Sequence, residues 1–461
     1  MSWDSLRYPA IVAVFCAASV LTGCQGLANA PAPPPPNPNG SLKSVNHIIF
    51  MAQENRGFDH YFGQLPKYLS KNGYPQTVDG TPPDAMNLDA NGNPVTPFHM
   101  ISQCTENISP FWNESHSSRN HEDPTSSDAP MDGFVQVAGH FAEDVGFTDT
   151  EGRRTMGYFN ETDLPFYYFM AANFATSDRW FSPAMTRTQP NRMYLVAASS
   201  YGYVYPPTQA LDKPTIFDEL QAANITWRVY VTDDFNNPLS NGSFLSQFTV
   251  ASKYPQNFVS AQQFVADAQA GNLPQVTMID AGYNSGRDEH PFDFPGEPGD
   301  GAQHGSAYVA GLINGFIQSQ SWKDSIFIFT YDESGDFYDH VPPLQTVSPD
   351  GIPPQGLQPG DVCYGITGGS CDFTYTGFRI PLIVISPFTK KNYVSHTPAD
   401  YTAILKLIET RFNVPSLTAR DAAQFDMTEF FDFKTVPWAT PPSNVPAQPD
   451  ALPCTDQLPP P

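Results

Sequence analysis

Short apolar runs recur along the chain and predict buried strands. They are His47–Ala52, Thr226–Thr232, Gln275–Ala281, Ser325–Glu333 and Ile380–Pro387. Apolar and polar residues do not alternate strictly within them, a pattern typical of a parallel sheet that is covered on both faces. The intervening sequence predicts helices over Thr215–Ala223, Ala302–Gln320 and Asp400–Phe412. Because strands and helices alternate, we predict a layered α/β domain with a mostly parallel sheet.

Polar clusters follow three of these predicted strands. Glu54 and Asn55 come directly after the first, His290 follows the third, and Asp332 and Glu333 end the fourth. In open α/β sheets, ligands bind beyond the carboxyl ends of the strands. We therefore expect these clusters to meet at one rim of the sheet and to form a catalytic or metal-binding site there.

The adjacent acids Asp332 and Glu333 indicate a bound cation. Neighbouring carboxylates repel each other unless a proton or a cation lies between them. Hard divalent cations suit such a pair, and zinc also accepts carboxylate together with histidine. The alternative is a solvated turn whose acids only cap a helix.

A hydroxyl residue precedes an apolar helix in the segment "RTQPNRMYLVAASSYG", Arg187–Gly202. Thr188 suits the N-cap position, and proline is common in the first helical turn. A helix N-terminus also stabilises anions, so the same hydroxyl could attack a phosphate. The residues alone favour capping and leave the nucleophile as the second interpretation.

Two of the ten histidines lie among acidic and polar neighbours, His290 in "RDEHPFDFPG" and His116 in "NESHSSRNH". Acidic neighbours raise the basicity of an imidazole and orient it for proton transfer. A structural or surface role is the alternative for each. The chain has no GxSxG elbow, HExxH pair, Walker loop or Gly-rich dinucleotide fingerprint, which argues against serine hydrolases, zincin proteases, NTPases and dehydrogenases.

Composition narrows the class of protein further. The 461 residues are 40% hydrophobic and 13% aromatic, enough for a sizeable core. The formal charge of −24 argues against nucleic acid as a partner, because phosphate backbones attract basic surfaces. The 47 prolines indicate long loops.

The N-terminus predicts export. The apolar run Ala10–Leu21 is too short to span a bilayer, and "LTGC" at its end resembles the lipobox of bacterial lipoproteins. We predict a signal peptide over residues 1–23 and a lipid on Cys24 that anchors the protein at the cell envelope, in the outer membrane or periplasm. An ordinary cleaved signal and secretion are the alternative. Residues 24–43 contain "PAPPPPNPNG" and predict an extended tether.

Four cysteines remain for the exported chain, an even number that suits an oxidising compartment. Cys363 and Cys371 enclose a short loop and predict a local bridge. Cys104 and Cys454 would then connect the body to the proline-rich tail, residues 436–461.

Five motifs occur in an order that resembles a known family. They are "ENRGFDHYFGQLP", "TQPNR", "EHP", "TYDESGDFYDHVPP" and "YVSHTPADYTAILKLIETRF". The resemblance is to the bacterial phosphoesterase family that contains phosphatidylcholine-hydrolysing phospholipases C and a group of acid phosphatases. It extends roughly over residues 44–433 and defines a predicted catalytic domain at 44–435. It implies an alkaline-phosphatase-like, three-layer α/β/α sandwich.

The resemblance also implies a role for each residue type. It places a divalent metal ion among Glu54, Asn55, Thr188, Asp332 and Glu333. Thr188 becomes the nucleophile, and Asn55 stabilises the phosphoryl oxygens. His290, and less directly His116, would face the phosphoryl group, with His290 protonating the leaving alcohol.

Three positions depart from the motifs of the relatives. Gly57 replaces a serine, Ser334 a histidine and Asp336 a glycine. Every implied metal ligand is retained, so these departures bear on the substrate more than on the reaction class.

The resulting hypothesis is metal-assisted hydrolysis of phosphate esters, with a phospholipid or a small phosphate ester as substrate. A phospholipase C-type phosphodiesterase is favoured slightly by aromatic-rich loops, and an acid phosphatase is the alternative. The departures at Ser334 and Asp336 leave a third option from another class, a surface-displayed binding protein on the same scaffold.

Overall fold

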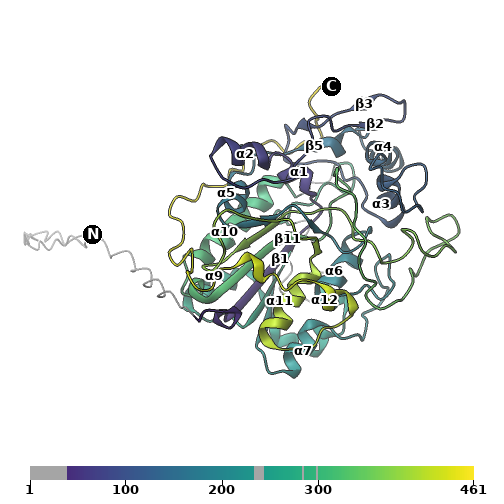
Figure 1. Ribbon diagram of the computed structural model, residues 1–461. Coiled ribbons are helices and arrows are strands. Elements are labelled where there is room, and N and C mark those ends of the chain that lie inside the picture. The colour runs from purple at the N-terminus through teal and green to yellow at the C-terminus, as the bar shows by residue number, and fades with distance from the viewer. Residues whose placement is uncertain (1–38, 233–242, 283–284, 297–299, 461) are drawn as a thin grey trace, which may run out of the picture. The chain divides into compact units, whose positions relative to one another are not determined.

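The computed structural model describes residues 39–232, 243–282, 285–296 and 300–460 (Figure 1). The predicted signal peptide, Cys24 and most of the predicted tether lie outside these residues. Among the helices of the described ranges, none is both long and apolar enough to cross a membrane.

A central sheet of eight strands organises the described chain. Its order is β13 (Tyr393–Ser395), β6 (Ala175–Ser177), β12 (Leu382–Ile385), β11 (Ser325–Tyr331), β1 (His47–Gln53), β10 (Val276–Asp280), β8 (Trp227–Val231) and β9 (Phe258–Ser260). All neighbours pair in parallel except β12, which runs antiparallel to both β11 and β6. The five predicted strands are confirmed, and so is the mostly parallel α/β class. The direction of β12 was not evident from its apolar run.

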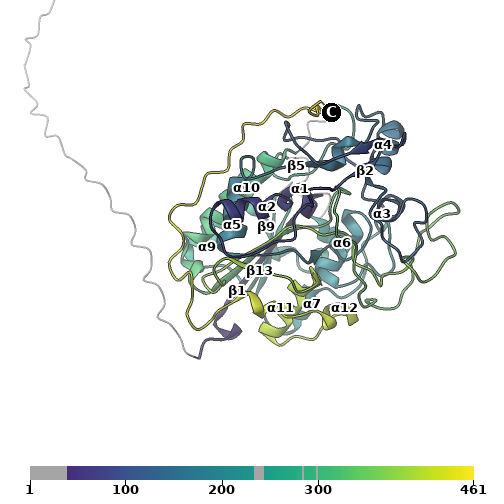
Figure 2. The ribbon, with the colours of Figure 1, turned by 45° about the horizontal axis from the view of Figure 1, so that its top comes forward.

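Helices cover both faces of this sheet (Figures 1 and 2). One layer holds α2 (Leu65–Lys71), α5 (Pro165–Asn173), α9 (Phe264–Ala270) and α10 (Ala302–Ile317). The other holds α6 (Thr188–Ala197), α7 (Ile216–Ala222), α11 (Thr402–Phe412) and α12 (Ala419–Ala423). Burial on both faces explains why the strands are mostly apolar: β11 and β10 are buried at every residue. The three helices predicted from the sequence are α7, α10 and α11.

Further helices and short strands complete the described chain. They are α1 (Phe58–Phe62), α3 (Trp112–Arg119), α4 (Phe134–Val145), α8 (Val250–Lys253), β2 (Asn87–Leu88), β3 (Pro94–Val95), β4 (Phe98–His99), β5 (Gly157–Tyr158), β7 (Trp180–Phe181) and β14 (Ala399–Asp400). The helices α3 and α4 pack against each other, and the cavity described below is reached by Phe111, which directly precedes α3, and by Phe141 and Val145 of α4.

The register of the central strands brings their carboxyl ends together. Gln53 at the end of β1 pairs with Tyr331 at the end of β11, and Met51 pairs with Ile279 of β10. Residues that follow these three strands therefore start from one edge of the sheet. The predicted convergence of the polar clusters follows from this register.

Both predicted disulfides are present, Cys104–Cys454 and Cys363–Cys371. The tail is also held by hydrogen bonds: Ser102 Oγ donates to the carbonyl of Pro453 at 2.9 Å, and Trp322 Nε1 donates to that of Trp438 at 3.0 Å. The described part of the proline-rich tail thus lies along the body.

Candidate active site

The ends of β1 and β11 are joined through Asp332. Its Oδ1 accepts from the backbone N–H of Asn55 at 3.1 Å and from that of Glu333 at 2.8 Å. The backbone N–H of Glu54 donates to Asp288 Oδ1 at 3.1 Å. Asn55 adopts a left-handed conformation with φ of 60°, which asparagine tolerates better than most residues. The chain therefore turns sharply at Asn55, where its amide enters the site.

Arg192 forms ion pairs with two of the acids, Glu54 and Asp332. It lies in α6 and is buried, with Nε 3.2 Å from Asp332 Oδ2 and NH2 3.4 Å from Glu54 Oε1. Burial alone would lower the pKa of Arg192, but Asp332 and Glu54 raise it above its ordinary value. Arg192 therefore stays protonated and is paired with both acids.

Thr188 is the first residue of α6, not its N-cap. The N-cap is Arg187, and the Thr188 hydroxyl donates to Asn55 Oδ1 at 3.3 Å. The capping interpretation of Thr188 is therefore wrong: the hydroxyl donates to the Asn55 side chain rather than to its own helix. The turn before the helix is instead held by Asn191, whose Oδ1 accepts from Ala184 N at 3.1 Å.

His290 contacts the other end of the same amide. Its Nε2 lies 2.9 Å from Asn55 Nδ2, and its Nδ1 lies 2.6 Å from the carbonyl of Pro291. An amide nitrogen only donates, so Nε2 accepts and the ring proton is on Nδ1, where it donates to Pro291. Burial lowers the pKa of His290, which agrees with a neutral ring. Thr188, Asn55 and His290 thus form one hydrogen-bonded chain.

The acids around these three hydrogen-bonded residues are crowded and buried. Burial raises the pKa of Glu54 and that of Glu333 well above the usual value, and it raises that of Asp288 to about 8. Within the described part of the chain, Glu333 Oε1 and Asp288 Oδ2 are buried without a hydrogen bond. Asp332 and Glu333 are 0% and 2% exposed, so the solvated-turn interpretation is wrong. Buried carboxylates with unsatisfied oxygens fit a bound cation.

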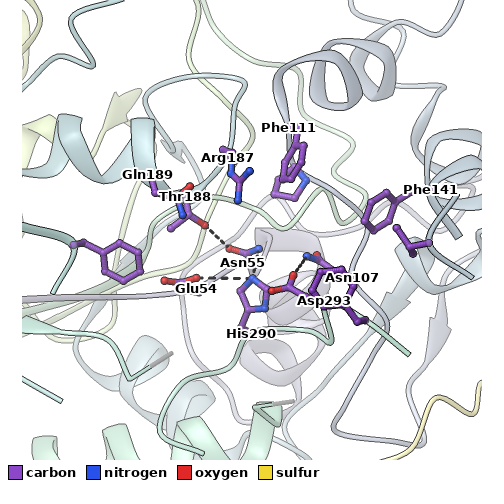
Figure 3. A pocket seen from close by; sticks show the side chains of 14 residues that line it. Glu54, Asn55, Asn107, Phe111, Phe141, Arg187, Thr188, Gln189, His290 and Asp293 are labelled. Carbon is purple, nitrogen blue, oxygen red and sulfur yellow. Dashed lines mark hydrogen bonds and ion pairs between the residues drawn. The ribbon is translucent and has the colours of Figure 1, made fainter. Parts of the chain in front are cut away.

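A cavity of about 460 Å³ opens in front of these residues. Glu54, Asn55, Thr188, Gln189 and His290 line its polar side. Phe111, Phe141, Val145, Phe244 and Phe294 line most of the rest, with Arg187, Asn107, Pro110 and Asp293 between them. Figure 3 shows Thr188, Asn55, Glu54 and His290 grouped on one side and Phe111 and Phe141 on the other. We call the phenylalanines that line the cavity its aromatic wall. A ligand in the cavity can therefore place a polar reacting group next to Thr188 and an apolar group against the aromatic wall.

His116 is not brought to this cavity. It is buried in α3, with Nδ1 2.6 Å from the carbonyl of Trp112 and Nε2 2.9 Å from that of Ser370. It does not belong to the lining residues, and both ring nitrogens contact backbone carbonyls. Its acidic neighbour in sequence, Glu114, gave a misleading signal, because a helix turns neighbouring side chains to different faces.

Comparison with known proteins assigns the chain to a family. The Phosphoesterase family matches residues 45–415 of the chain. The chain belongs to the Phosphoesterase family. It is accordingly a hydrolase that acts on phosphate esters.

Named relatives of this phosphoesterase include "Phospholipase C B" of Mycobacterium tuberculosis, which is 28% identical over 444 residues, covering 86% of this chain and 80% of the relative. "Non-specific phospholipase C1" of Arabidopsis thaliana is 28% identical over 436 residues, covering 87% and 74%. Among solved structures, a protein in the alkaline phosphatase superfamily from Vibrio parahaemolyticus shares 9% identity with a TM-score of 0.38, covering 85% of this chain and 72% of that one.

Two of the three positions at which this phosphoesterase departs from its relatives' motifs are neighbours in space. A Cβ atom on Gly57 would lie 3.4 Å from the carbonyl oxygen of Ser334. Asp336, where relatives have glycine, is buried with a φ of 57° and accepts from Ser118 Oγ at 2.5 Å. None of the three positions, Gly57, Ser334 and Asp336, lines the cavity.

A second acidic cluster lies on the other side of α1. Asp59, Asp339 and His340 have ligand atoms within 4.8 Å of one another and could by geometry hold a metal ion. However, Arg379 NH2 lies 3.1 Å from Asp59 Oδ1 and 2.9 Å from Asp339 Oδ1. Because the guanidinium already supplies the positive charge, we interpret this cluster as a structural ion network.

The aromatic side of the cavity and Arg187 were not predicted from the sequence. Phe111, Phe141 and Phe244 come from segments far apart in the chain, and an isolated phenylalanine does not distinguish a cavity wall from a core. Arg187 could have been noticed, since it directly precedes the predicted nucleophile in "RTQPNR".

Proposed function

We propose that this phosphoesterase is a phospholipase C-type phosphodiesterase that uses Thr188 as its nucleophile with the assistance of a divalent metal ion. One observation supports this most directly. The Thr188 hydroxyl contacts Asn55 in a cavity that is also lined by Glu54, a buried acid whose Oε1 makes no hydrogen bond among the described residues. A nucleophilic hydroxyl, an amide donor and a cation site are the groups that phosphoryl transfer requires.

The metal ion would be held by Glu54, Asn55, Thr188, Asp332 and Glu333. These residues supply oxygen atoms, which divalent cations prefer, and their carboxylates follow β1 and β11 at one edge of the sheet. When bound, the cation would lower the pKa of the threonine hydroxyl and balance negative charge on the phosphoryl oxygens.

The protein's own groups position the reaction. Thr188 Oγ attacks phosphorus, the bond to the leaving alcohol breaks, and Asn55 Nδ2 donates to a phosphoryl oxygen. His290 begins neutral with a lone pair on Nε2, so it accepts the proton of the Thr188 hydroxyl as Oγ attacks and then delivers that proton to the leaving alcohol. Water then attacks the phosphothreonine and restores the hydroxyl. His290 is thus a proton carrier, and no role is proposed for His116.

The aromatic wall supports a phospholipid substrate. Phe111, Phe141, Phe244 and Phe294 give the cavity an apolar side that a small phosphomonoester would leave uncovered. Phe294 is 65% exposed at this wall, which would allow contact with a lipid aggregate. The relatives named as phospholipases C support the same class.

The deciding experiment measures two products from the purified, metal-supplemented protein. Release of choline phosphate from phosphatidylcholine vesicles is compared with release of phosphate from glycerol phosphate. The proposal expects the first activity to exceed the second. Preferential release from the monoester would identify an acid phosphatase, and absence of both, with metal bound, would favour a non-catalytic binding protein.

A further inference from the structure

One cationic side chain in the cavity has no part in the mechanism above. Among the described residues that line the cavity, Arg187 is the one that is a lysine or an arginine. Arg192 lies beneath the cavity and is already paired with Glu54 and Asp332. The site is rich in carboxylates, which repel a phosphate substrate. A cation that faces the cavity therefore raises the affinity for that substrate.

The Arg187 guanidinium is held in a defined position. Its Cζ lies 4.0 Å from the centroid of the Phe111 ring, a distance typical of a cation–π stack. Figure 3 shows the guanidinium extending into the cavity between Thr188 and Phe111, above Asn55. A stacked guanidinium still presents its N–H groups in the plane of the fork, where they can donate to two oxygens of one phosphoryl group.

We propose that Arg187 binds the non-bridging oxygens of the phosphoryl group and determines how strongly the enzyme discriminates between substrates of different charge. This inference rests on the proposed function and deepens it by assigning the phosphate-recognising side chain. Arg187 lines the cavity, whereas Arg192 does not line it and is paired with Glu54 and Asp332. Phe111 acts as the support that fixes the orientation of the fork.

The charge of the substrate provides the test. A phosphomonoester above pH 7 has two negative charges, and a phosphodiester has one. Coulomb energy is proportional to the charge, so removal of Arg187 should affect the monoester about twice as strongly on a logarithmic scale. Two substrates that share a leaving group and differ by one charge separate this effect from the chemistry of bond breaking.

The experiment compares 4-nitrophenyl phosphate with methyl 4-nitrophenyl phosphate at pH 8, using wild type, Arg187→Met and Arg187→Lys. For Arg187→Met we expect kcat/KM to fall on the order of 100-fold for the monoester and about 10-fold for the diester. Arg187→Lys, which keeps the charge, should restore the ratio of the two substrates but not the full rate. Inhibition by inorganic phosphate should weaken in Arg187→Met in parallel with the monoester.

Two further variants control for structural effects. Phe111→Leu keeps the cation and removes its support, so both substrates should be affected by a similar, smaller factor. Arg153→Met removes an arginine that also stacks on an aromatic ring, 5.4 Å from the Phe98 centroid, but does not line the cavity. It should leave both rates unchanged.

The role of Arg187 can be tested even if the protein hydrolyses neither substrate. If wild type hydrolyses neither substrate, the proposed function fails at this step, and calorimetric binding of inorganic phosphate to wild type and Arg187→Met still tests the anion site. Equal losses on both substrates in Arg187→Met, with unchanged phosphate binding, would overturn the proposal and leave Arg187 as a structural residue at the start of α6.

Discussion

Replacement of Thr188 by alanine separates chemistry from stability more clearly than any other change in this enzyme. The hydroxyl makes a 3.3 Å hydrogen bond to Asn55 and does not cap its helix. Loss of such a bond costs about 1 kcal/mol of folding free energy, and loss of a buried methyl group costs about the same. Alanine's better helix propensity offsets roughly 0.5 kcal/mol. The net cost is about 1–2 kcal/mol, or a few degrees in melting temperature.

The expected effect on rate is far larger. A missing nucleophile raises the barrier by about 5 kcal/mol or more, which corresponds to a loss of more than about 10³-fold in kcat. Thr188→Ser should retain part of the activity because the hydroxyl survives. The assay is hydrolysis of a chromogenic phosphodiester, measured together with thermal unfolding of each variant.

A matched threonine elsewhere provides the control. Thr418 is a true N-cap: its side chain accepts from Arg420 N at 3.1 Å and forms a capping box with Asp421. Thr418→Ala should lower the melting temperature by a similar amount and leave the rate intact. If Thr188→Ala behaved like Thr418→Ala, with near-normal turnover, the nucleophile assignment would be refuted.

Three further predictions concern the metal, pH and export. Glu333→Gln should lose bound metal and activity together, measured by elemental analysis and turnover; full activity with a normal metal content would contradict the ligand assignment. Burial raises the pKa of Asp336 to about 8. The folded state therefore keeps its proton while the unfolded state loses it, and stability falls as the pH rises from about 4 toward 8. Asp336→Asn should remove up to about 1.4 kcal/mol per pH unit of this dependence, measured by urea unfolding at pH 5 and pH 8; identical slopes for wild type and variant would refute it. The mature protein should begin at an acylated Cys24, and an intact mass that shows an unmodified N-terminus elsewhere would exclude the lipid anchor.

The sheet could be predicted well because its signal is local. The strand Ser325–Tyr331 is mostly apolar because both of its faces are covered, and the acids that follow it, Asp332 and Glu333, must emerge at the strand's carboxyl end. The same logic located Glu54 and Asn55. It could not give the direction of β12, because a fully buried strand has the same composition whichever way it runs.

The sequence by itself therefore determined the α/β class, the central strands, both disulfides and the residue types at the candidate catalytic rim. Tertiary structure decided which way the Thr188 hydroxyl points, because its partner Asn55 lies 133 positions earlier in the chain. It also separated His116 from the cavity and brought Phe111 beneath Arg187. These outcomes depend on contacts between distant segments, and no pattern within a single segment encodes them.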